Sequence, residues 1–177
     1  MISTPVSPSI AADKIKHLQR EGYCILENMA GEALLNRTRD CVNKAVAEQD
    51  SDKLARTISS GTLISSVKYP ELSGIIGNPA AIKALDDMGL PGSKFWKAVI
   101  ISKPPGGPRL YWYQDCMMWQ DPRAYSDFPP MTFLMYYLDD TTRENGCLRV
   151  LPGTHRKRHL HPTVRCQVDA QSNNHDF

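Results

Sequence analysis

The first half of the chain alternates hydrophobic and polar positions at helical spacing. In residues 11–21, Ile15 and Leu18 fall on one face, and Gly22 follows as a natural helix stop. Residues 31–48 carry a similar apolar face opposite charged side chains, which predicts a longer helix. The N-terminal half is therefore expected to be mainly helical.

A third helix is predicted over residues 78–85, because an asparagine suited to the N-cap is followed by proline at the first helical position. Short strands are expected at residues 23–26 and 62–67. Residues 49–61 are charged and rich in serine, which predicts a loop.

In the second half, β-branched and aromatic residues gather in runs separated by Pro, Gly and Asp. The predicted strands cover residues 95–102, 110–114, 131–138 and 147–151. Because helices precede strands, the expected fold class is α+β, with a largely antiparallel sandwich or barrel.

The chain has 177 residues, of which 41% are hydrophobic, and this is enough for one domain with its own core. That domain is expected to cover residues 1–160. Residues 161–177 have few apolar positions and no amphipathic period, so they are expected to form a disordered tail.

Charge and cysteine content exclude several classes of protein. Lys and Arg number 21 against 19 Asp and Glu, a balance that gives no reason to propose a nucleic acid or a membrane surface as partner. No apolar run is long enough for a membrane span, and the first residues do not resemble a secretory leader. The 5 cysteines form no C-x-x-C pair and are interpreted as reduced thiols, so the expected localisation is cytoplasmic.

Residues 110–115 read Leu-Tyr-Trp-Tyr-Gln-Asp and carry the main chemical signal. Side chains two residues apart on a strand share a face, so Tyr113 and Asp115 are expected on the same side. A His-x-Asp pair placed in this way supplies two ligands of the 2-His-1-carboxylate site that holds Fe(II). Because tyrosine occupies the histidine position, the pattern indicates an iron site whose first ligand has been replaced.

Three segments together resemble the phytanoyl-CoA dioxygenase (PhyH) family of Fe(II) and 2-oxoglutarate-dependent oxygenases. They are residues 111–115, where the family has Trp-His-Gln-Asp, residues 133–140, and residues 144–155, which end in Pro-Gly-Thr-His. Residues 18–28 are similar to the family's first helix and strand, so the resemblance covers about residues 11–160. The motif Trp-x-Gln-Asp-Cys-Met-x-Trp is most similar to that of fungal enzymes of secondary metabolism, including the dioxygenase of ergot alkaloid clusters.

The resemblance implies a partial double-stranded β-helix, a cupin-like jelly roll with N-terminal helices and with its C-terminal strands missing. Iron would lie between Tyr113, Asp115 and a second histidine on a later strand, followed by an arginine that pairs with 2-oxoglutarate. His159 and His161 lie too close to the Pro-Gly-Thr-His turn for this role, and His175 lies in the polar tail. Of the implied ligands, only Asp115 is matched.

A tyrosine is a poor substitute for an iron-binding imidazole. It must lose a proton from a pKa of about 10 before it becomes a good ligand. Without the arginine, 2-oxoglutarate loses a charge-assisted anchor. Fe(II) and 2-oxoglutarate are therefore the family's cofactors but are not expected to bind here. Tyr113 is interpreted as a packed aromatic residue hydrogen-bonded to Asp115, and Asp115 as a vestigial metal ligand.

Several other residues are weaker candidates for cofactor or metal contacts. By resemblance, Lys97 and Gln114 are candidates for contact with the co-substrate, and Lys103 lies close by. His159-x-His161 with Cys166 nearby is a possible chelate, but the spacing matches no established zinc pattern.

For the remaining candidates we prefer a structural explanation over a functional one. The basic run at residues 155–159 is interpreted as a solvated face rather than a phosphate site. Tyr136 and Arg149 lie on predicted strands that would line the barrel in relatives, where either residue is equally well explained as structural. The three tryptophans are interpreted as core or loop anchors rather than a substrate cage; they are Trp96, Trp112 and Trp119.

Three functional hypotheses follow from these residues. The first is a degenerate, inactive relative of the dioxygenases whose ancestor hydroxylated a small-molecule substrate. The second is an active oxygenase with an unusual site built from Tyr113, Asp115 and a histidine such as His161 or His175. The third is a non-catalytic binding module that forms a homodimer or pairs with an intact homologue.

Overall fold

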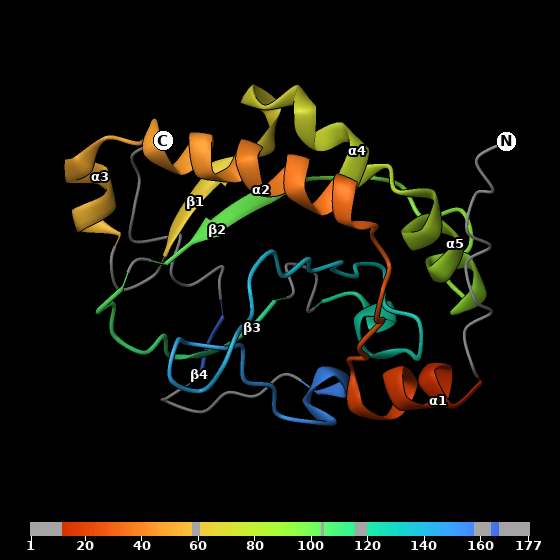
Figure 1. Cartoon of the computed structure of the whole chain (residues 1–177). Coiled ribbons are helices and arrows are strands. Elements are labelled where there is room, and N and C mark those ends of the chain that lie inside the picture. Colours follow the sequence, from red (N-terminus) through yellow and green to blue (C-terminus); the bar gives the residue numbers. More distant parts are fainter. Residues whose placement is uncertain (1–11, 58–60, 104, 116–119, 158–163, 167–177) are drawn as a thin grey trace, which may run out of the picture. The chain divides into compact units, whose positions relative to one another are not determined.

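The computed structural model describes residues 12–57, 61–103, 105–115, 120–157 and, for the backbone, 164–166 (Figure 1). Contacts divide the chain into two compact units. Unit 1 is built from Leu26–Arg109 and Tyr137–Cys147. Unit 2 is built from the described residues up to Ile25, from Leu110–Tyr136 and from the described residues after Cys147.

A long helix and a two-stranded sheet form the centre of unit 1 (Figure 1). Helix α2 spans Glu32–Ala47, and strands β1 (Thr62–Ser65) and β2 (Val99–Ser102) pair antiparallel. The neighbouring residues Ile64 and Ile100 are buried in the core. The other face of the same sheet carries residues 63 and 101, whose side chains are exposed.

Shorter helices complete unit 1, and their ends follow local sequence rules. The side chain of Asn78 caps α5 (Pro79–Asp87) by accepting a hydrogen bond of 3.1 Å from the Ala80 amide. Its amide nitrogen also donates to the carbonyl of Met29 at 2.7 Å. The remaining helical segments of the unit are α3 (Ser51–Arg56), η1 (Ser66–Lys68), η2 (Pro70–Leu72) and α4 (Ser73–Ile76).

An arginine on α2 holds the second segment of unit 1. Arg39 Nε donates to the carbonyl of Leu138 at 3.0 Å and forms an ion pair with Asp139 at 3.3 Å. A closed turn follows, in which Asn145 accepts from the Thr142 amide and donates to the carbonyl of residue 140. Residues 137–147 are thereby tied to the helical part of the unit.

The described residues of unit 2 include helix α1 and a short parallel strand pair. Helix α1 spans Ala12–Glu21 and ends at Gly22, whose φ of 84° lies in the left-handed region that favours glycine. Strand β3 (Trp112–Gln114) pairs parallel with β4 (Val164–Cys166). The 3-10 turns η3 (Pro122–Tyr125) and η4 (Thr154–Arg156) complete the unit.

The predicted helices are confirmed, but several predicted strands are wrong. Residues 23–26, 131–138 and 147–151 form no strand, and the predicted loop at residues 49–61 contains α3, which Asp50 caps. The predicted antiparallel pairing holds for β1 with β2 but not for the parallel pair β3 and β4. The partial jelly roll is not confirmed, because the described residues form only two-stranded sheets.

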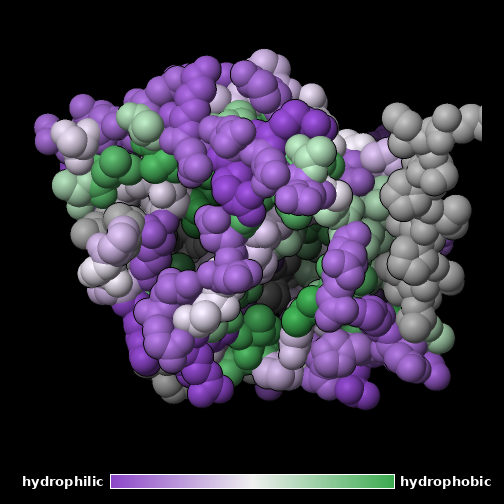
Figure 2. All heavy atoms as spheres, viewed as in Figure 1, coloured by the Kyte–Doolittle hydropathy of each residue, from purple (hydrophilic) through white to green (hydrophobic). Residues whose placement is uncertain are grey.

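The missing strands have a physical explanation. Phe133, Leu134 and Met135 are 56%, 42% and 51% exposed, although their β-branched and aromatic surroundings favour a strand. A strand requires a hydrogen-bonded neighbour and a face to bury, and propensity alone supplies neither. Figure 2 shows such hydrophobic side chains at the surface among polar ones.

The expected tail is only partly described. Three of its residues form β4, and residues 161–163 and 167–177 lie outside the described part of the chain. The division into a domain at residues 1–160 and a tail therefore stays a prediction. Within the described ranges, no helix has both the length and the apolar content needed to cross a lipid bilayer.

Candidate functional site

Of the two residues at the centre of the sequence motif, Tyr113 lies on strand β3 and Asp115 directly follows it. Tyr113 is half-buried, and its ring lies edge-on to that of Tyr111, with the ring centroids 6.2 Å apart. Asp115 follows the strand and remains accessible to solvent. Neighbouring protein atoms nevertheless remove part of its water, which raises the pKa of the Asp115 carboxyl. The predicted hydrogen bond between Tyr113 and Asp115 stays a prediction.

Gln114, which lies between these two residues, binds the backbone of a distant turn. Its Nε2 donates to the carbonyls of Thr154 and Lys157, both at 2.9 Å. Both protons of the side-chain amide are therefore used by backbone groups of the Pro152–Lys157 turn. Gln114 as a contact for a cofactor stays a prediction, but the structure gives its amide nitrogen a structural role.

The same turn is fixed to the end of helix α1. The Gly153 amide donates to the Glu21 carbonyl at 2.9 Å, and the His155 ring Nε2 lies 3.1 Å from the Gln19 carbonyl. The guanidinium of Arg156 donates to that same carbonyl at 2.6 Å. The last carbonyls of a helix lack partners within the helix and attract cations, so the turn caps α1.

These contacts correct part of the interpretation of the basic run. His155 is half-buried and Arg156 is bound to a carbonyl, so the two residues do more than form a solvated face. Lys157 is exposed, as expected for such a face. Residues 158 and 159 lie outside the described residues.

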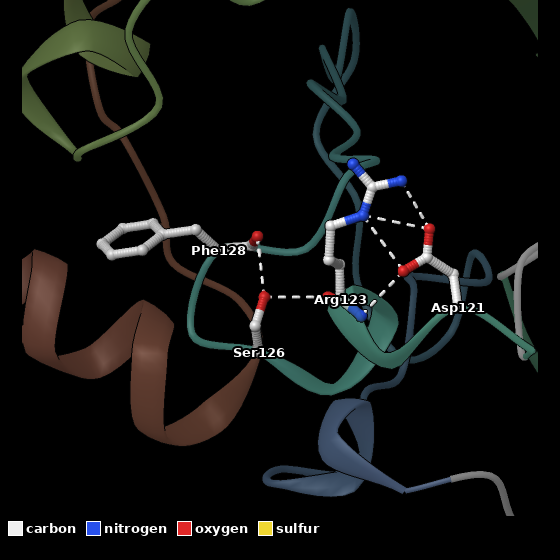
Figure 3. Close-up of polar contacts among 4 residues, drawn as sticks. All are labelled: Asp121, Arg123, Ser126 and Phe128. Atoms are coloured by element: carbon white, nitrogen blue, oxygen red, sulfur yellow. Dashed lines mark hydrogen bonds and ion pairs between the residues drawn. The ribbon is translucent and has the colours of Figure 1, made fainter.

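A self-contained loop after β3 supplies a further anchor for the turn (Figure 3). Asp121 accepts hydrogen bonds from the Arg123 amide at 2.9 Å and from its Nε at 3.0 Å. Ser126 Oγ lies 2.8 Å from the carbonyls of both Arg123 and Phe128. This loop carries Asp127, which forms an ion pair with Arg156 of the turn at 2.5 Å.

The loop has a predicted pH dependence. Hydrogen bonds from Arg123 lower the pKa of Asp121 below its ordinary value. A carboxyl with a lowered folded-state pKa stabilises the protein above its unfolded pKa of about 3.9, and this contribution is lost as the pH falls through the lowered value. We therefore expect Asp121→Asn to lower the unfolding midpoint at pH 7 but not at pH 2. Thermal unfolding at several pH values tests this, and an equal loss at both ends would contradict it.

The structure tests some of the other residues proposed from the sequence and leaves others as predictions. The Arg149 guanidinium lies 5.3 Å from the centroid of the Trp112 ring, a cation–π contact that gives both residues a structural partner. Trp96 is 64% exposed, which excludes the core but not the loop in its interpretation as a core or loop anchor. Lys97 is exposed and belongs to unit 1, whereas β3 belongs to unit 2. Its contact with a cofactor stays a prediction. Tyr136 is half-buried.

The described side chains around β3 do not supply a complete set of iron ligands. Among the side chains that the structure describes, no group of three or more His, Cys, Asp or Glu is placed to hold a metal ion. The motif itself contributes one carboxyl group and one phenol. The candidate chelate of His159, His161 and Cys166, and the histidine at 175, fall outside the described side chains.

Comparison with known proteins decides the family. The sequence model of the family described as phytanoyl-CoA dioxygenase (PhyH) matches residues 18–175. The chain belongs to the PhyH family. The family consists of Fe(II)/2-oxoglutarate dioxygenases, so the two cofactors proposed from the motif fit at the level of the family. The match includes most of the segment expected to be a tail.

The curated relatives are distant and longer. An uncharacterized protein of Mycobacterium tuberculosis is 25% identical over 167 residues, which cover 89% of this chain and 60% of the relative. The ectoine dioxygenase of Nocardia farcinica is 25% identical over 161 residues, which cover 83% of this chain and 52% of the relative. The PhyH chain thus spans about half to three fifths of the length of these relatives. No solved structure matches it.

Sequence reasoning missed the contacts that organise this site. The clamp from Gln114 to the turn and the docking of the turn on α1 join residues that are 40 and 136 positions apart. The only local signals were the glycine at position 22 and the Pro-Gly-Thr-His turn itself. Neither signal identifies the distant residue that it contacts.

Proposed function

We propose that this chain is a catalytically inactive member of the PhyH family that retains the carboxylate of the iron site without its first histidine. The observation that carries the proposal is the motif at β3, in which Tyr113 lies on the strand and Asp115 directly follows it. By resemblance, Asp115 takes the position of the family's aspartate and Tyr113 takes that of its histidine. The place of Tyr113 within the strand, two residues before Asp115, supports this assignment.

The phenol of Tyr113 must lose its proton before it can bind iron well. An imidazole binds Fe(II) in its neutral form, whereas a phenol with a pKa of about 10 must first be deprotonated at a cost of about 4 kcal/mol at pH 7. Asp115 alone is then the one dependable donor that the motif supplies, and water competes well with a single carboxylate for a divalent ion. Without bound iron, the oxidative decarboxylation of 2-oxoglutarate has no starting point.

Metal content and turnover test the proposal directly. The purified chain is incubated anaerobically with Fe(II) and 2-oxoglutarate, then desalted for iron analysis or exposed to O2 for succinate measurement. We expect no retained iron and no succinate above a sample without protein. One equivalent of iron, together with succinate release that Asp115→Ala abolishes, would overturn the proposal. That result would favour the active alternative with a Tyr, Asp and His site, and His161→Ala and His175→Ala would then identify the histidine.

A second candidate function is a non-catalytic binding module. The exposed side chains of Phe133, Leu134 and Met135 favour it, because consecutive large apolar residues at a surface suit a protein partner. The partner would be a second copy of the chain or an intact homologue. Sedimentation of the chain alone and mixed with a full-length PhyH protein tests this. A monodisperse monomer that does not associate with the homologue would exclude it.

We also propose a class of ligand for the ancestral pocket. The motif Trp-x-Gln-Asp-Cys-Met-x-Trp supports a ligand from fungal secondary metabolism, a small molecule of the ergot alkaloid type. The relative named ectoine dioxygenase suggests a different small molecule. A thermal shift with an ergot-type indole alkaloid but not with ectoine is the expected result, and the reverse pattern would reject the assignment.

A further inference from the structure

The middle residue of the motif binds the backbone of a turn that is distant in the sequence. Gln114 lies between Tyr113 and Asp115, and on a strand its side chain leaves the backbone on the opposite side from theirs. From that side it reaches the carbonyls of Thr154 and Lys157, each at 2.9 Å. These two carbonyls bracket the η4 turn, so one amide group holds both ends of the turn.

The turn is itself held on two further sides. Gly153, His155 and Arg156 bind the last carbonyls of α1. Arg156 also pairs with Asp127 of the loop that follows β3. The turn is thus a fixed point to which α1 and the loop after β3 are both tied, and Gln114 connects β3 to it.

We propose that Gln114 is a positioning residue whose side-chain amide fixes the rotation of β3 about its own axis, and thereby the direction in which the side chains at positions 113 and 115 point. Strand β3 has three residues and pairs with β4, so the two amide hydrogen bonds of Gln114 add to a short ladder. The inference rests on the proposed function in one respect, because it takes positions 113 and 115 as the ligand positions of the family.

The test uses a chain in which the ligand pair has been restored. Tyr113→His provides the background, and Co(II) alone is the probe, because its visible absorption reports binding and ligand geometry. In this background Gln114→Met keeps the side-chain length and removes both donors. We expect Gln114→Met to weaken Co(II) binding by about tenfold or more, in the range typical of residues that orient metal ligands. Gln114→Asn, which keeps the amide but is too short to reach both carbonyls, should weaken binding as well and serves if Gln114→Met fails to fold.

A matched control separates positioning from general loss of stability. Gln49 Nε2 also donates to a backbone carbonyl, that of Ala45, at 2.8 Å. Gln49 belongs to unit 1, and so Gln49→Met in the same background removes an equivalent amide donor from the unit that does not contain β3. It should leave the Co(II) affinity unchanged. Equal affinity of the Gln114→Met and Gln49→Met chains would overturn the inference while leaving the proposed function intact.

A second readout does not require metal. With 3-fluorotyrosine incorporated, the fluorine resonance of Tyr113 is assigned by its absence in Tyr113→Phe. We expect Gln114→Met to shift or broaden this resonance, because the Tyr113 ring would lose its fixed edge-on position against Tyr111. Gln49→Met should leave it unchanged. If Tyr113→His fails to bind Co(II), the proposed ligand position is wrong, and the fluorine resonance alone then decides the inference: an unmoved signal in Gln114→Met rejects it.

Discussion

The Tyr113→His variant is expected to bind divalent metal at least about tenfold, and up to about a thousandfold, more tightly than the parent chain. The upper figure is the deprotonation cost of a phenol, about three pKa units at pH 7, which an imidazole does not incur. The lower figure allows for incomplete placement of the new ring, since two donors on one strand supply only part of an iron site. Titration with Co(II), followed by absorbance and calorimetry, measures the gain.

Tyr111→His is the matched control for this experiment. It introduces the same imidazole on the same face of the segment, but two residues earlier. Residues 111 and 115 are then about 13 Å apart along an extended chain, too far for both to bind one ion, whereas residues 113 and 115 are about 7 Å apart. A gain that is equal in both variants, or one that survives Asp115→Asn, would show that the imidazole acts alone and that the family site is not present at β3.

The sequence predicted those parts of the fold whose causes are local. Helix α5 begins where Asn78 caps it and proline follows, and α1 ends at Gly22, because capping and backbone freedom depend on neighbouring residues. The strand that carries the motif was placed correctly for a similar reason. The aromatic run at residues 110–114, which follows a segment rich in Pro and Gly, identifies β3 to within two residues.

The sequence did not predict features that depend on distant partners. Residues 131–138 have the composition of a strand, yet composition does not state whether a neighbouring strand is present, and the described chain provides none. The parallel pairing of β3 with β4 was missed because it joins Trp112 to Val164 across a long connection. The structural role of Gln114 was missed for the same reason, and its contact with a cofactor stays a prediction. Its resemblance to a cofactor contact came from the motif, whereas its bonds to Thr154 and Lys157 come from the tertiary fold.

Gly22→Ala is expected to destabilise the chain by about 2 to 5 kcal/mol, combining a backbone cost of roughly 1–2 kcal/mol with an overpacking cost of about 1–3 kcal/mol. The backbone of Gly22 has a φ of 84°, which an L side chain rarely adopts. A Cβ placed there would lie 2.5 Å from His155 Nδ1 and 2.6 Å from its Cγ. His155 has little freedom to retreat, because its Nε2 is bonded to the Gln19 carbonyl. Chemical unfolding of the variant measures the loss.

Gly92→Ala isolates the backbone part of this effect. Gly92 has a similar φ of 68°, and a Cβ there would meet no atom within 4 Å, so this variant should cost only about 1 kcal/mol.

His155→Ala combined with Gly22→Ala should recover the steric part, because the double variant removes the ring that the new Cβ meets. The coupling between the two sites is expected to exceed about 0.5 kcal/mol. His155 Nδ1 is buried without a hydrogen-bond partner among the described residues, and it faces the bare Cα of Gly22. The contact therefore depends on close packing alone on that side of the ring. Equal losses in Gly22→Ala and Gly92→Ala would mean that the turn does not pack against α1 in this way, and the anchoring assigned to His155 would then be wrong.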